Sequence, residues 1–170
     1  QAVDDDYYDE EMNPVMCTGG YYGFHRIYND QGQNSENVYL GMNGLPVCNS
    51  SGYAREKYLF DKEKRVARKF YFDVNGEATT GPVGQFGEAY TYDGNSRITK
   101  VVFLGKDGSP QAVSAGYTIS EWNYYRDGTL KTNMYFDESG NPVSLSKGQY
   151  GVKYVNGVTL YLNQYGRVKL

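Results

Sequence analysis

The sequence YFDESGNPV at residues 135–143 occurs in related form five times along the chain. The other copies begin at Tyr7, Tyr39, Tyr71 and Phe103, so each copy starts 32 residues after the one before it. A spacing that is kept without insertion or deletion across most of 170 residues is typical of a repeat protein. The sequence therefore predicts tandem units near residues 7–38, 39–70, 71–102, 103–134 and 135–170, the last of which includes a C-terminal cap.

The composition favours strands and turns. The chain has 19 Tyr and 21 Gly, and aromatic residues favour β-strands whereas Gly favours turns. A net charge of -3 offers no basic surface for a phosphate backbone, so nucleic acid is not expected as a partner. No apolar run approaches the ~18 residues of a transmembrane helix, so membrane insertion is not expected. Because the composition does not change sharply along the chain, we expect residues 1–170 to form a single repeat-array domain.

Two columns of Gly punctuate the units when the copies are aligned. Gly in the first column precedes a Pro in most copies, and this combination supplies the backbone angles that a tight turn needs. The second column is complete, which predicts a backbone angle or a close approach that a Cβ would obstruct. The first column consists of Gly44, Gly76, Gly108 and Gly140, with Met12 in the first copy, and the second of Gly20, Gly52, Gly84, Gly116 and Gly148.

Two strand-like runs lie between these turns in each unit. In the third unit, residues 86–92 and 97–104 are joined by DGNS at residues 93–96, which is the signature of a β-hairpin. Matching joints fall at residues 29–32, 61–64 and 126–128, and the last unit has the two-residue joint Asn156-Gly157. The predicted fold class is therefore all-β, with tandem 32-residue hairpin repeats stacked as an elongated, twisted antiparallel sheet or β-solenoid.

Side-chain alternation assigns the residues of each strand to two faces. On the second strand of each hairpin, we predict that the face with three aliphatic or aromatic columns is mostly core. The opposite face of that strand carries a first aromatic column, and the first strand of the hairpin carries a second. The predicted core columns are Val66, Ile98 and Leu130; Phe70, Val102 and Met134; and Phe72, Leu104 and Phe136. The first aromatic column is Tyr39, Tyr71, Phe103 and Tyr135, and the second is Tyr58, Tyr90, Trp122 and Tyr154.

Short strings within the units resemble known bacterial repeats. Residues 90–98, YTYDGNSRI, resemble the tyrosine-aspartate (YD) repeats of large bacterial surface and secreted proteins. Residues 71–76, YFDVNG, and residues 135–140, YFDESG, resemble the hairpins of Gram-positive cell-wall-binding repeats and of clostridial toxin tails. The resemblance covers nearly the whole chain. It implies a non-catalytic bacterial module, secreted or exposed at the cell surface, that acts in adhesion or binds wall glycans.

Residues for catalysis or metal binding are scarce. A hydrolytic triad needs a base, and the only His, His25, stands in a column that also holds Lys, Ala and Glu, so we interpret it as a surface residue. The Asp residues sit at turn positions, where capping of the backbone explains them. The strings Asp73-x-Asn75 and Asp137-x-Ser139 lack the rest of a calcium-binding loop, and two Cys with one His are too few for zinc. We expect no enzyme activity, no metal and no cofactor.

Cys17 and Cys48 occupy nearly the same position in successive units. Stacked neighbours could bring them near each other, so a disulfide is one interpretation and two buried free thiols are the other. The chain starts at Gln1 without a Met, which indicates either a processed mature form or a piece of a longer polypeptide. No signal peptide is visible, although a removed one would leave such a start.

The aromatic columns are the feature that suggests a ligand. Tyr and Trp rings present a flat apolar face and a polar edge, which suits sugar rings or the side chains of another protein. Either column could be the exposed one, and aromatic residues on both faces could also be core. We expect a module that binds a glycan or cell-wall polymer through these columns. The alternative is a structural spacer, or an adhesin-like segment that binds another surface protein.

Overall fold

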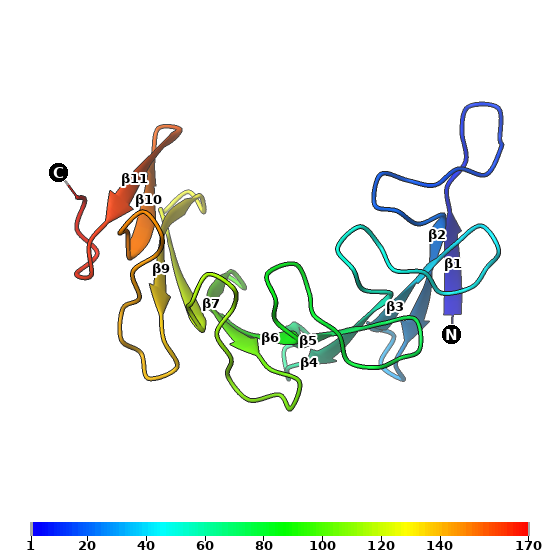
Figure 1. Ribbon diagram of the computed structural model, residues 1–170, viewed down its shortest axis with the longest axis horizontal. Coiled ribbons are helices and arrows are strands. Elements are labelled where there is room, and N and C mark those ends of the chain that lie inside the picture. Colours follow the sequence, from blue (N-terminus) through cyan, green and yellow to red (C-terminus); the bar gives the residue numbers. More distant parts are fainter. Residues whose placement is uncertain (1, 170) are drawn as a thin grey trace. The chain divides into compact units, whose positions relative to one another are not determined.

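The computed structural model describes residues 2–169, which form eleven β-strands joined by turns (Figure 1). The strands follow one another in sequence order in an antiparallel sheet, which confirms the predicted all-β hairpin fold. The described residues contain no helix with the length and apolar character that a membrane crossing requires. The strands are β1 (Ala2–Asp6), β2 (Gly23–Tyr28), β3 (Asn34–Leu40), β4 (Arg55–Phe60), β5 (Val66–Phe72), β6 (Gly87–Tyr92), β7 (Ile98–Leu104), β8 (Ile119–Tyr124), β9 (Leu130–Phe136), β10 (Gly151–Val155) and β11 (Val158–Leu162).

Contacts within the chain gather in two compact units, which divide between Gly87 and Glu88. In the first unit, β1 to β5 pair in order, and in the second unit β7 to β11 pair in order. The prediction that residues 1–170 form one domain stays a prediction.

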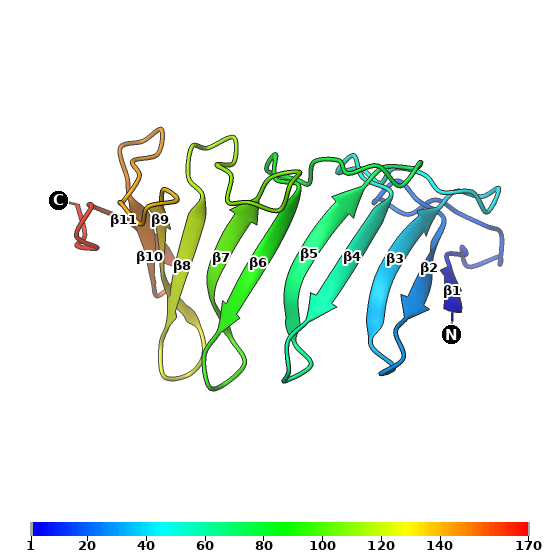
Figure 2. The same cartoon turned by 90° about the horizontal axis from the view of Figure 1, so that it is seen from below.

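The hairpins share one geometry. The first strands β2, β4, β6, β8 and β10 begin 32 residues apart. Within the first unit, Phe24 pairs with Tyr39 in hairpin β2–β3, and Glu56 pairs with Tyr71 in hairpin β4–β5. A bulge interrupts both hairpins just before the turn. Figure 2 shows that these two hairpin turns lie at one end of the strands, whereas the longer connectors to and from neighbouring hairpins lie at the other end.

Tight turns occupy the positions that the Gly columns predicted. In the turn that ends at Gly52, the Gly52 N–H donates to the carbonyl of Asn49 at 2.9 Å. Gly52, Gly84 and Gly116 all have φ of 89°, so the second Gly column has one backbone conformation at these positions. Met12 takes the same left-handed region with φ of 65°. The joint Asn156-Gly157 has positive φ at both residues, as a two-residue hairpin turn requires.

Both faces of the sheet contribute to the core. On the face that carries the first aromatic column, Tyr71 is 1% exposed, and Val101 and Phe103 are 4% and 9% exposed. The opposite face, which was predicted to be mostly core, holds the buried residues Val38, Leu104, Ile119 and Leu162, but the other eight residues of the predicted core columns are only half-buried. The prediction is corrected in that the first-column face is also core, because the connectors cover it. Val113 of a connector is buried against Val101 and Phe103.

Replacing Gly116 with Ala tests the backbone requirement of the second Gly column. A Cβ at Gly116 would meet no atom within 4 Å, so the cost comes from the left-handed φ of 89° alone. We expect Gly116→Ala to lower the free energy of unfolding by about 1–2 kcal/mol, measured by urea denaturation. Gly94→Ala is the matched control, because Gly94 has equally open surroundings and no positive φ. Equal midpoints for the two variants would contradict this explanation.

Candidate functional site

The first aromatic column forms an interior ladder of rings with a set of tyrosines from the connectors. In the first unit, the ring centroid of Tyr39 lies 4.6 Å from that of Tyr21 and 5.8 Å from that of Tyr53, and Tyr53 lies 4.7 Å from Tyr71. In the second unit, Tyr117 lies 5.6 Å from Phe103 and 4.7 Å from Tyr135. Such ring pairs add to the stability that area burial gives. Tyr71 and Phe103 are therefore packed inside the protein.

Sequence reasoning missed the connector members of this ladder. Tyr21, Tyr53 and Tyr117 each follow a Gly of the second column by one residue, so the 32-residue period could have found them. The column is broken by Gln85 and Gln149. Gln85 is 2% exposed, and its Nε2 donates to the Tyr71 hydroxyl at 3.5 Å. An amide thus takes the place of a ring at this step of the ladder.

A buried glutamate joins the two predicted aromatic columns in the first unit. Glu56 is 8% exposed, and its carboxylate accepts hydrogen bonds from the hydroxyls of Tyr39 at 3.0 Å, Tyr53 at 3.1 Å and Tyr58 at 2.7 Å. The Nζ of Lys69 lies 3.8 Å from the same carboxylate. The strand register puts Glu56 opposite Tyr71 and Tyr58 opposite Lys69, so both columns lie on one face of the sheet.

Similar anchoring occurs at two further residues of the second column, Tyr90 and Trp122. In both cases the polar end of the ring bonds to the residue two positions earlier on the strand. Tyr90 donates its hydroxyl hydrogen to Glu88, and the Trp122 indole N–H donates to the Ser120 hydroxyl at 2.8 Å. Ser120 in turn donates to the side-chain oxygen of Asn133 at 2.6 Å. These hydrogen bonds fix the orientation of rings that are only half-buried.

Burial controls the electrostatics of the ladder. Burial first, and then the negative charge of Glu56, raises the pKa of the Tyr39 and Tyr58 hydroxyls well above the ordinary value of 10.0. In the second unit, burial raises the pKa of Tyr135 to about 12. These hydroxyls therefore stay protonated near neutral pH and act as hydrogen-bond donors.

Three grooves between neighbouring hairpins are lined by residues of the second column. In the first unit, the Tyr58 groove has a volume of about 890 Å³ and lies between the ends of hairpins β2–β3 and β4–β5. In the second unit, the Tyr154 groove has about 530 Å³ and lies between the ends of β8–β9 and β10–β11. The Trp122 groove has about 280 Å³ and lies between β6–β7 and β8–β9.

These grooves use equivalent positions of the repeat. The Tyr58 and Tyr154 grooves are three repeats apart. Their equivalent lining residues are Asn29 and Tyr125, Gln31 and Asp127, and Gln33 and Thr129. Ser35, Tyr58 and Leu59 correspond to Thr99, Trp122 and Asn123 of the Trp122 groove. One aromatic column thus contributes to a hollow at several hairpin junctions, and the turn side chains around it are polar. Of the predicted site residues, Tyr58, Trp122 and Tyr154 line these grooves.

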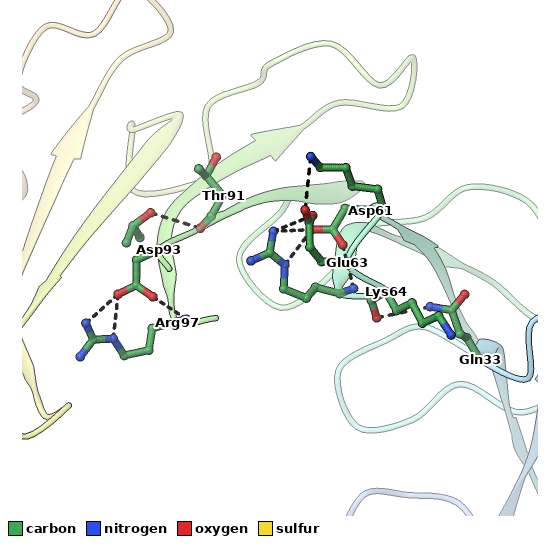
Figure 3. Close-up of polar contacts among 10 residues, drawn as sticks. Gln33, Asp61, Glu63, Lys64, Thr91, Asp93 and Arg97 are labelled. Carbon is green, nitrogen blue, oxygen red and sulfur yellow. Dashed lines mark hydrogen bonds and ion pairs between the residues drawn. The ribbon is translucent and has the colours of Figure 1, made fainter. Parts of the chain in front are cut away.

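Most carboxylates at the hairpin turns are occupied by their own backbone. Asp93 accepts the Arg97 backbone N–H at 3.0 Å and the Arg97 guanidinium at 2.7 Å, as Figure 3 shows. These hydrogen bonds, led by the backbone one, hold the pKa of Asp93 below 3.8. Figure 3 also shows Gln33 reaching across to the carbonyl of Lys64, at 3.3 Å, in the Tyr58 groove. Asp73 and Asp137 likewise accept two backbone N–H groups each, which confirms the turn interpretation of these strings.

A further hollow of about 550 Å³ lies on the opposite face of the first unit and includes His25, Asp4 and Arg55. Two of its polar side chains are paired, since His25 contacts Asp4 and the Arg55 guanidinium lies 3.4 Å from Glu36, whereas the buried Nε of Arg55 has no hydrogen-bond partner among the described residues. Among residues 2–169, no group of three or more His, Cys, Asp or Glu side chains is placed to hold a metal ion. Cys17 and Cys48 are free thiols, and Cys48 is exposed rather than buried as expected.

No model of a known protein family matches the chain, and a search of curated proteins finds no match to its sequence.

Replacing Glu56 tests whether the buried carboxylate holds the ladder together. Glu56→Ala leaves three tyrosine hydroxyls without their acceptor, so we expect the free energy of unfolding to fall by about 1–3 kcal/mol. Glu63→Ala is the matched control, because the Glu63 side chain is 47% exposed and contacts only Lys62 and Arg65 in the turn. We expect that control to change stability by less than about 0.5 kcal/mol. A similar loss in both variants, measured in urea, would rule out a special role for Glu56.

Alkaline pH provides a second test of the ladder. The pKa of Tyr39 and Tyr58 is raised in the folded state, so the unfolded chain loses these protons first as the pH rises above 10.0. The stability that these groups contribute is present below pH 10.0 and is lost above it. We expect the urea midpoint to fall above pH 10.0, and to fall less steeply in Tyr39→Phe. A midpoint that does not change with pH would contradict the burial of these hydroxyls.

Proposed function

We propose that this protein is a non-catalytic module that binds a glycan or cell-wall polymer in the grooves lined by Tyr58, Trp122 and Tyr154. The observation that supports this most strongly is the recurrence of a groove at equivalent repeat positions, each lined by a residue of the second aromatic column.

The chemistry around the grooves suits sugars. Carbohydrate rings offer an apolar face and a rim of hydroxyls, so they need an aromatic or aliphatic surface beside donors and acceptors. The Trp122 groove is also lined by Thr91, Thr99 and Asn123, and the Tyr154 groove by Thr129 and Asn156. Each groove offers one aromatic residue, so a single contact is weak, and repetition along a polymer multiplies it through effective concentration.

The hydrogen bonds of the carboxylates favour a binding module over an enzyme. The carboxylates of Glu56 and Asp93 are held by tyrosine hydroxyls and by turn hydrogen bonds, so neither is free to transfer a proton to a substrate. The resemblance of residues 71–76 and 135–140 to bacterial wall-binding and toxin repeats adds the cellular setting. We propose a bacterial protein that is secreted or exposed at the cell surface.

A second function, contact with another protein in an adhesin-like or spacer segment, is favoured by the edge of the second unit. Among the described strands, β11 pairs only with β10. Its residues carry no charge, and Val158 and Tyr161 are 55% and 38% exposed. Uncharged, exposed edge strands invite strand addition. Protein binding that depends on β11, in a chain that binds no glycan, would favour this function over the first.

Substitutions in the second unit test the glycan function. Trp122 is the only Trp, so fluorescence changes come from its surroundings. We expect wall glycan fragments to change this fluorescence, and Tyr154→Ala to weaken binding roughly tenfold through the loss of one aromatic contact. Trp122→Ala should weaken binding at least as much, when followed by calorimetry.

Tyr165→Ala is the matched control for both variants, because Tyr165 is 75% exposed and lines none of the three grooves. Because Trp122 also packs against the buried cluster around Val101, the urea midpoint of each variant must be measured alongside binding. Equal binding by Tyr154→Ala, Tyr165→Ala and the unchanged protein would show that the grooves are not the glycan site.

A further inference from the structure

The outer edge of β11 corresponds to the strand edge that receives the next hairpin in the other repeats. At the end of β3, Tyr39 donates its backbone N–H to the carbonyl of Ala54, the residue before β4, at 2.8 Å. Equivalent bonds run from Tyr7 to Tyr22, from Tyr71 to Phe86, from Phe103 to Thr118 and from Tyr135 to Tyr150. Tyr161 has the equivalent place on β11, because the next residue, Leu162, forms the same isolated bridge to the returning chain as Leu40 does.

The backbone of β11 presents hydrogen-bonding groups at this edge. Among the described strands, β11 pairs only with β10, beside which it lies in Figure 1. The Tyr161 carbonyl accepts the Lys169 N–H at 2.9 Å, as the Tyr39 carbonyl accepts the Val47 N–H at 3.0 Å, so it points away from β10. The N–H and C=O of one residue lie on the same side of an antiparallel strand, and the side alternates along the strand. The N–H groups of Thr159 and Tyr161 therefore both point to the outer edge.

The side chains of β11 leave the edge unprotected. Natural proteins guard edge strands against pairing with charged residues, Pro or bulges. Neither β11 nor the Asn156-Gly157 turn before it has a charged residue or a Pro, and Val158 is 55% exposed. The first strand in the sheet order, β1, differs because it carries Asp4, Asp5 and Asp6 in succession. The chain thus guards the edge of β1 with charge and leaves the edge of β11 able to pair.

A second copy of the same strand fits this edge. A two-fold axis that puts Thr159 opposite the Thr159 of a second copy makes the two β11 strands antiparallel. Tyr161 then donates its N–H to the Gly157 carbonyl of the second copy, which repeats the bond from Tyr39 to Ala54. Val158 lies opposite Leu160, so apolar side chains meet on one face and no charges oppose each other. The same operation on β1 would set Asp against Asp, which is destabilising.

From the unguarded edge and its backbone groups, we infer that the chain forms a two-fold dimer by antiparallel pairing of β11 with the β11 of a second copy. This inference does not rest on the glycan function. Two strands of five residues bury less than the roughly 800 Å² per partner of a standard interface. The dimer is therefore reversible and depends on concentration.

Sedimentation of the full chain of residues 1–170 tests the inference. We expect the dimer fraction to rise as the chain concentration increases from about 1 to about 100 µM. Thr159→Lys should raise the dissociation constant at least about tenfold, because two ammonium groups then face each other across the axis. Thr91→Lys is the matched control, since Thr91 is also an exposed strand residue but lies on β6, between β5 and β7 in the sheet order. It should leave the dimer unchanged.

A charge exchange shows whether β11 meets itself. An equimolar mixture of Thr159→Lys and Thr159→Glu chains should dimerise more tightly than Thr159→Lys alone, because opposite charges then lie across the axis. Because Thr159 is exposed, we expect the urea midpoints of both variants to stay close to that of the unchanged chain.

Three results would overturn the inference. They are a chain that stays monomeric at about 100 µM, a mixture that associates no more tightly than Thr159→Lys alone, and tighter association of Thr159→Lys by itself. The last result would indicate that β11 pairs with the Asp-rich β1 of another copy instead. Each of these results leaves the glycan function standing, because Thr159 lines none of the three grooves.

Discussion

Each connector packs against one face of its hairpin, and the rest of the structure depends on this packing. Every connector contains two tight turns closed by backbone hydrogen bonds, such as the bond of 2.8 Å from the Gly116 N–H to the Val113 carbonyl. These turns bring a connector back over the strands that it has just left. A hairpin alone buries too little to be stable, and here the connector supplies the second layer. The ring ladder of Tyr39, Tyr53 and Tyr71 is the result.

Tyrosine rings that are buried on one face need hydrogen-bond acceptors for their hydroxyls, and nearby residues of the chain supply them. A buried phenol needs an acceptor for its hydroxyl hydrogen, because an unpaired polar group is costly inside a protein. Glu56 meets this need for three tyrosines at once in the first unit. Two repeats later, the position equivalent to Glu56 is Ser120, whose hydroxyl accepts the single N–H of Trp122. In the last repeat, the position equivalent to Glu56 is Val152, whose side chain cannot accept a hydrogen bond.

The candidate site follows from the same arrangement. Connectors cover the part of the face near the first column, and the second column lies toward the hairpin turns, where neighbouring hairpins leave grooves. The rings there are half-buried, so they are held firmly at one end and remain accessible along the groove. Turn residues vary from unit to unit, from Gln33 to Thr129, without disturbing the backbone. The scaffold is therefore constant whereas the surface chemistry of each groove can differ.

The sequence by itself determined the all-β class, the hairpin joints and the turn positions. These features depend on local backbone angles, and the residue types report them directly, as Gly116 and Asn156-Gly157 do. Met12 shows that a column can predict a left-handed residue even where Gly is missing. The alternation of side chains told which residues share a face, but the two faces of a strand are equivalent until something covers one of them.

Only the tertiary structure decided which face the connectors cover, because that depends on the direction in which they fold back. It is for this reason that Tyr71 lies inside, that Tyr58 lines a groove, and that Glu56 is buried among hydroxyls. No local pattern in the sequence distinguishes a glutamate that faces water from one that a connector will enclose. The difference is made by residues far along the chain, through packing and hydrogen bonds that form only when the hairpins stand beside one another.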